Sequence, residues 1–129
     1  YIFNEHFIEH LTREEGALFL KECARVIKPY GVLRIVCPDL GVIIRDYQNK
    51  YLDRSKEVWR PLTPCQMVNG ALHLWEHKFV YDADEITLIL QEAGFSNIQF
   101  PIYRVSQHKE LQGIDQRPHH QELIVEASK

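Results

Sequence analysis

The chain has 129 residues, of which 45% are hydrophobic, and its formal net charge at pH 7 is −3. This length suits a single domain spanning residues 1–129, and the hydrophobic fraction is too high for a disordered chain. The small negative charge argues against a nucleic-acid partner, because nucleic-acid binders usually carry a basic face. No apolar run reaches the ~20 residues of a membrane-spanning helix. We therefore expect no membrane partner, and we expect no secretory signal peptide.

The three cysteines, Cys23, Cys37 and Cys65, are odd in number and far apart in the sequence. This spacing argues against a disulfide framework and against a zinc site. Cys23 and Cys37 lie in apolar surroundings, so we expect them to be buried as small core residues. Free thiols favour a reducing, cytoplasmic location.

The chain opens on Tyr1-Ile2-Phe3, an apolar pattern typical of the end of a core strand. A natural N-terminus seldom starts inside such a strand, so we expect further residues upstream in the native protein. A helix follows, with Thr12 as its N-cap and Glu15 completing a capping box. It is expected to end at Lys28, because the next residue is proline.

Residues 32–37 form a nearly continuous apolar run, which predicts a strand buried on both faces, as in a parallel sheet. Asp39 is placed to cap the next helix. The apolar positions of that helix recur at helical spacing and are Leu40, Ile43, Ile44, Tyr47 and Tyr51.

Residues 52–64 are polar and irregular. Thr63 and Pro64 then predict the start of a helix that continues to Trp75. Asp82 and Glu85 are the capping residues of a further helix, which is expected to end at Gly94.

Residues 97–103 and 121–127 predict two closing strands, the first at an edge or a bulge because it contains Pro101. Strands and helices alternate before them, which is typical of an α/β fold with right-handed crossovers. The two closing strands have no helix between them, so we expect them to pair antiparallel.

Three motifs now stand in order along the chain: Asn4 to Leu11, which ends in Glu-His-Leu; Lys28-Pro29-Tyr30-Gly31; and Glu92-Ala93-Gly94-Phe95. Together they resemble motifs of the class I S-adenosylmethionine-dependent methyltransferases, with the type-11 group the most similar. The resemblance covers nearly all of this chain but only the second half of the family fold. It implies a partial Rossmann-like sheet, made of the family's strands four to seven with a terminal antiparallel pair, flanked by helices.

The resemblance implies transfer of a methyl group from S-adenosylmethionine to a small molecule, provided that the N-terminal half is present. That half supplies the family's glycine-rich cofactor loop and its ribose-binding acidic residue. The six glycines here are too far apart to form such a loop. We therefore do not expect these residues alone to hold the cofactor. The alternative is a truncated, non-catalytic interaction module that forms a homo-oligomer through an exposed strand edge at Tyr1-Ile2-Phe3.

By resemblance, Asn4, Glu5 and His6 follow the fourth strand and would contact the cofactor; the alternative is an ordinary polar loop. His10 would act as a base or orient the substrate, unless it only packs where the following helix begins. His77 would act from a lid-like insert, residues 53–81, in which the aromatic residues Trp59, Trp75 and Tyr81 form walls or a small core of their own.

His73 and His77 are spaced to share one face of a helix. A metal ion would need a third ligand, and the sequence shows no obvious candidate, so we expect no metal. His119 and His120, with His108 before them, are interpreted as parts of solvated turns.

Overall fold

The computed structural model describes residues 1–52, 59–117 and 121–129. Within them it contains the strands β1 (Ile2–Glu5), β2 (Leu33–Pro38), β3 (Asn97–Gln99) and β4 (Glu122–Ser128). The α-helices are α1 (Arg13–Val26), α2 (Leu40–Gln48), α3 (Pro64–His73) and α4 (Ala83–Ala93). Three short 3-10 helices are η1 (Ile8–His10), η2 (Leu74–Glu76) and η3 (Lys109–Leu111). His119, His120 and part of the expected insert, residues 53–58, lie outside the described residues.

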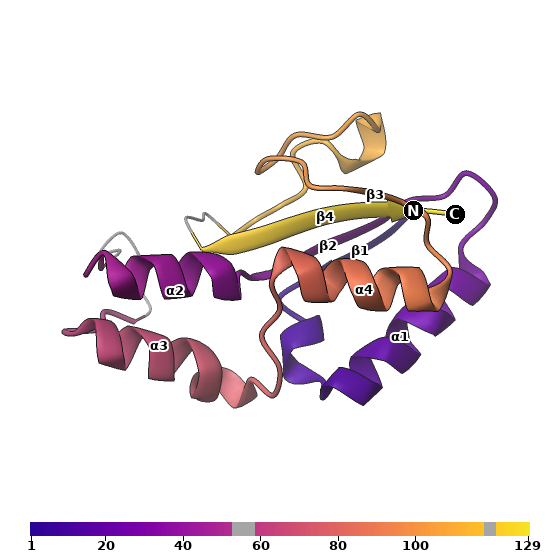
Figure 1. The fold of residues 1–129 in the computed structure, drawn as a ribbon. Helices are drawn as coiled ribbons and strands as arrows, with labels where there is room; N and C mark the ends of the chain where they lie inside the picture. The colour runs from indigo at the N-terminus through magenta and orange to yellow at the C-terminus, as the bar shows by residue number, and fades with distance from the viewer. Residues whose placement is uncertain (53–58, 118–120) are drawn as a thin grey trace.

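The strands form one mixed sheet in the order β1-β2-β4-β3 (Figure 1). β1 and β2 are parallel, whereas β4 is antiparallel to both β2 and β3. The expected terminal antiparallel pair is therefore confirmed. Helices α1 and α4 pack together below the sheet in Figure 1, and the segment between β3 and β4 lies above it. The fold is α/β, as the alternation of elements predicted.

The starts of α1 and α4 and the end of α4 agree with the local signals in the sequence, whereas α1 ends at Val26, two residues before the expected Lys28. The backbone N–H of Glu15 donates to the Thr12 hydroxyl (3.2 Å), and the Thr12 N–H donates to the Glu15 carboxylate (2.8 Å). The Asp82 carboxylate accepts from the Glu85 N–H in the same way (2.8 Å). Gly94 ends α4 with φ of 101°, in the left-handed region that side chains disfavour. Capping is a local interaction, which is why these positions were predictable.

Several boundaries and side chains differ from the prediction. α2 ends at Gln48, before Tyr51, and both Tyr47 and Tyr51 are exposed and add little to the core. α3 ends at His73, and the next turn has positive φ at Trp75 (56°) and Glu76 (62°). His73 and His77 therefore do not share a helical face. The strand expected over residues 97–103 ends at Gln99, before Pro101, which has no N–H for the ladder.

The hydrophobic core lies between the sheet and helices α1 and α4. Tyr81 belongs to this core and is fully buried, so its expected role as a wall of a lid is wrong. The reason is a backbone contact: Tyr81 pairs with Asp39 in a parallel bridge, and its carbonyl accepts from the Leu40 N–H (2.8 Å). Trp59 and Trp75 pack edge to face at 5.7 Å, as a small core of the insert would.

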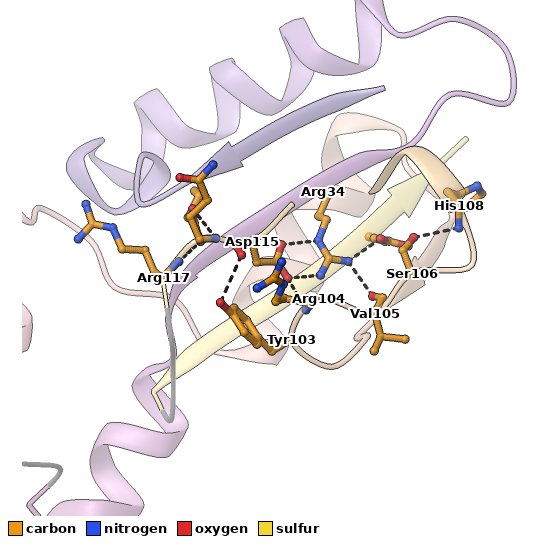
Figure 2. Close-up of polar contacts among 11 residues, drawn as sticks. Arg34, Tyr103, Arg104, Val105, Ser106, His108, Asp115 and Arg117 are labelled. Carbon is orange, nitrogen blue, oxygen red and sulfur yellow. Dashed lines mark hydrogen bonds and ion pairs between the residues drawn. The ribbon is translucent and has the colours of Figure 1, made fainter. Parts of the chain in front are cut away.

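The opposite face of the sheet is covered by the chain between β3 and β4, which a buried arginine holds in place (Figure 2). Arg34 projects from β2 and is fully buried. Its guanidinium donates to both carboxylate oxygens of Asp115 (2.8 and 2.5 Å), to Glu126 (2.5 Å) and to the carbonyl of Val105 (3.1 Å). Charge neutralisation explains how one polar residue fits in an otherwise apolar strand.

All three cysteines are free, with Cys23 and Cys37 buried as expected and Cys65 exposed. Among the described helices, none has the length and apolar character needed to cross a membrane.

Candidate functional site

Polar side chains gather where β1 and β2 end and β4 begins. Glu5 pairs with Val36 at the end of β1, and Pro38 pairs with Glu122. The chain leaves β1 at His6 and leaves β2 at Asp39. In an open α/β sheet, ligands bind beyond the carboxyl ends of the parallel strands. A functional site is therefore expected at these carboxyl ends of β1 and β2.

His6 bridges two carboxylates at this edge. Its Nδ1 lies 3.0 Å from Glu9 Oε1, and its Nε2 lies 3.1 Å from Glu122 Oε2. Its backbone has φ of 51°. Its N–H donates to the Val36 carbonyl (2.9 Å), which extends the backbone hydrogen bonding between β1 and β2 by one residue. Burial alone lowers the pKa of His6, but the contacts with Glu122 and Glu9 outweigh burial and raise this pKa to about 9. The ring is therefore cationic at neutral pH.

Glu9 is the most enclosed acidic group of the site, with a side chain that is 0% exposed. Its backbone carbonyl accepts from the N–H groups of Lys78 (2.8 Å) and Phe79 (3.2 Å), which joins η1 to the segment after η2. Neither of its carboxylate oxygens has hydrogen-bond geometry to any described residue, although His6 lies at ion-pair distance. Oε1 is therefore paired with the cationic His6, and Oε2 is the oxygen left for a ligand.

The two histidines expected to be catalytic, His10 and His77, lie side by side although they are far apart in sequence. Their ring centroids are 5.0 Å apart, at an interplanar angle of 77°. His77 Nδ1 lies 2.7 Å from the carbonyl of Ala71, and a carbonyl can only accept. The Nδ1 of His77 must therefore carry the proton, which leaves Nε2 of the neutral ring with a free lone pair. The structure brings these two residues together with Glu9.

The three residues expected to contact the cofactor, Asn4, Glu5 and His6, point to different places. Asn4 lies on the same face of β1 as Ile2, which packs against the core. Both polar atoms of its amide are buried without a partner among the described residues. Glu5 instead accepts from the backbone N–H groups of Gln116 (3.0 and 3.2 Å) and Arg117 (3.0 Å). Glu5 thus holds a loop, whereas the Asn4 amide is buried without a partner among the described residues.

Two acidic residues of the site, Glu9 and Glu122, were not singled out from the sequence. Glu9 is adjacent to His10 in the Glu-His-Leu triplet, and this adjacency is the one feature of the sequence that could have indicated a functional role for Glu9. Glu122 is the first residue of β4, and the alternating pattern of that strand predicts it to be an ordinary solvent-facing residue. Its position beside His6 depends on the pairing of β4 with β2.

No family model matches the chain, and no curated protein matches it. A search of solved structures finds a crystal structure of the small RNA methyltransferase HEN1, with a TM-score of 0.52 and 13% sequence identity. The match covers 97% of this chain and 13% of that chain, so these residues span a small part of the protein they resemble. The fold is methyltransferase-like. At this identity, the likeness concerns the fold alone.

Proposed function

We propose that these residues form the substrate side of an S-adenosylmethionine-dependent methyltransferase that acts on a small molecule. The observation that carries the proposal is the likeness to a methyltransferase over 97% of the chain, with a mixed sheet that ends in an antiparallel pair. The three sequence motifs described above support it independently. The mild negative charge favours a small-molecule substrate over a nucleic acid, and the free thiols favour the cytoplasm.

S-adenosylmethionine, when bound, supplies an electrophilic methyl group on sulfur. The acceptor's lone pair forms the new bond to that carbon as the carbon–sulfur bond breaks, and the bonding electrons stay on sulfur. Proximity and orientation supply most of the rate in such a displacement. Asn4 offers an unpaired amide at the end of β1 that fits a polar group of the cofactor. His10 and His77 lie next to each other and are placed to orient the acceptor or take its proton.

His77 supports the idea that the insert covers the site. Its ring lies 5.7 Å from the ring of Trp75 and 5.0 Å from that of His10, so the insert contacts η1 directly. The lid-like role proposed for residues 53–81 therefore involves the segment from Trp75 to His77. The aromatic ring of Trp75 is partly exposed and offers a surface for an apolar substrate.

The residues present fit only one side of the cofactor. None of the six glycines lies close enough to another to form a loop that lets the backbone approach a ligand. We therefore infer that cofactor binding requires a glycine-rich loop supplied from outside these 129 residues.

The test is calorimetry with S-adenosylhomocysteine on the full-length gene product and on residues 1–129 alone. We expect binding by the full-length product and none by the shorter chain. Asn4→Ala in the full-length product should weaken binding about tenfold, the effect of one lost hydrogen bond of roughly 1.4 kcal/mol. Asn97→Ala, at the far edge of the sheet, is the matched control. No binding by the full-length product would refute the proposal.

A second candidate function is self-association without catalysis. β1 is an edge strand among the described strands, and Tyr1 and Phe3 are exposed there. An exposed apolar edge is able to pair with the strand of another chain. Light scattering of residues 1–129 should then show a dimer that Phe3→Lys converts to a monomer. A strictly monomeric species at high concentration would contradict this candidate.

A further inference from the structure

We propose that Glu9, His10 and His77 bind one divalent transition-metal ion of the zinc class. Each of these residues offers one ligand atom, and the three atoms lie within 4.8 Å of one another. Two imidazoles and one carboxylate are a common ligand set of zinc sites that keep a position open for water or substrate. Mg²⁺ and Ca²⁺ prefer oxygen ligands, so a site with two imidazoles favours a transition-metal ion over either of them.

The distances require only a small adjustment. Bonds from zinc to imidazole nitrogen and carboxylate oxygen are about 2.0–2.2 Å, which places tetrahedral ligand atoms roughly 3.4 Å apart. Starting from separations within 4.8 Å, each ligand atom would move inward by about 1 Å. Rotation about side-chain bonds allows such a movement, because the histidines are only partly buried.

The ligands are already oriented by contacts with other residues. The bond from His77 Nδ1 to the Ala71 carbonyl (2.7 Å) leaves Nε2 as the nitrogen that can bind a metal. Glu9 is held by His6, whose Nδ1 lies 3.0 Å from Oε1. Metal-binding histidines and carboxylates usually have such outer contacts, which fix their direction.

The carboxylate of Glu9 supplies the second, independent observation. It is fully buried; Oε1 lies 3.0 Å from the cationic His6, whereas Oε2 has no partner among the described residues. His6 is shared with Glu122, so it does not neutralise Glu9 alone. A metal ion between Glu9 and the two histidines would satisfy the carboxylate and explain why a buried acid is placed there.

The chain connectivity keeps the three ligands together before a metal arrives. Glu9 and His10 are adjacent in η1, and the N–H groups of Lys78 and Phe79 both donate to the Glu9 carbonyl. His77 is the residue just before these donors, so its ring is brought over η1. The site lies beyond the carboxyl end of β1, where an open metal position would face a bound molecule. This proposal does not rest on methyl transfer, and with a metal ion bound His10 and His77 serve as ligands rather than as a base.

The test uses the untagged full-length gene product, freed of metal with a chelator and titrated with Zn²⁺ in a calorimeter. We expect one ion per chain, and a visible absorption spectrum of a four- or five-coordinate site when Co²⁺ replaces Zn²⁺. His77→Ala removes a direct ligand and should lower the Zn²⁺ affinity by at least about 100-fold, because loss of a residue that only orients a ligand already lowers metal affinity by up to that factor.

His73→Ala is the matched control, because His73 is an exposed histidine four residues away that lies outside the cluster. It should leave the affinity unchanged. If His77→Ala folds poorly, thermal unfolding gives a second readout, since Zn²⁺ should raise the midpoint of the unaltered protein and not that of Glu9→Gln. The proposal is overturned if the unaltered protein binds no stoichiometric Zn²⁺, or if His73→Ala weakens binding as much as His77→Ala.

Discussion

Replacing Arg34 with methionine tests how the segment between β3 and β4 is held on the sheet. Methionine keeps a similar length but removes the charge and all donors. Two buried carboxylates, Asp115 and Glu126, then lose the cation they share. Removing one partner of a buried ion pair costs about 3–5 kcal/mol, because the remaining charge is left uncompensated. We expect a loss of that size, since the Arg34 side chain is 0% exposed.

Urea unfolding followed by circular dichroism measures this loss. For a chain of this length, about 3–5 kcal/mol corresponds to a decrease of roughly 10–20 °C in Tm. Hydrogen exchange gives a local readout, because the Arg104 N–H donates to Asp115 (2.7 Å) and should lose protection. A loss below about 1 kcal/mol, the range of exposed pairs, would refute the reasoning.

Two further variants separate the charge effect from a packing effect. The triple change of Arg34→Met, Asp115→Asn and Glu126→Gln removes all three charges of this cluster and should recover part of the stability, since no uncompensated charge of the cluster stays buried. Arg25→Met removes an arginine from an exposed pair with Glu22 and should leave Tm nearly unchanged. A triple variant as unstable as Arg34→Met would mean that packing, rather than charge, explains the loss.

Burial raises the pKa of Asp115, but the hydrogen bonds from Arg34 and the Arg104 N–H outweigh it, so the pKa lies below its usual value. The stabilisation is present above the unfolded pKa of about 3.9 and is lost as the pH falls through the folded pKa. Asp115→Asn should therefore flatten the acid decline in urea midpoints; an equally steep decline would contradict this assignment. Gly94→Ala should cost about 1–2 kcal/mol in urea unfolding because φ is 101°, a cost of the backbone alone since nothing lies within 4 Å of the added methyl; an unchanged midpoint would contradict it. Tyr81→Phe should leave Tm unchanged or higher, because the buried Tyr81 hydroxyl has no partner among the described residues; a clear decrease would reveal a missing contact.

The parts of the fold that depend on neighbouring residues were predictable from sequence. The caps at Thr12 and Asp82, the left-handed Gly94 and the apolar run of β2 all act within a few residues. Arg34 stands inside that run, and its acidic partner Asp115 is 81 residues away. No local pattern shows that a loop covers this face of the sheet, so the buried charges were not predicted.

The candidate site was predictable only in part, for the same reason. The sequence indicated His10 and His77 independently of each other. It could not predict their contact, because that contact depends on backbone hydrogen bonds from Lys78 and Phe79 to Glu9. The sequence shows no obvious third ligand for His73 and His77, and these two residues do not share a helical face because α3 ends at His73. The third ligand comes instead from η1, which tertiary pairing brings to His77.

Calorimetry of the full-length gene product with S-adenosylhomocysteine tests the central proposal most directly. The methyltransferase-like fold, the motifs and the unpaired amide of Asn4 predict saturable binding at one molecule per chain, weakened by Asn4→Ala and unaffected by Asn97→Ala. A full-length product that is folded and yet binds no S-adenosylhomocysteine would contradict the proposal, and would leave a methyltransferase-like fold with another use.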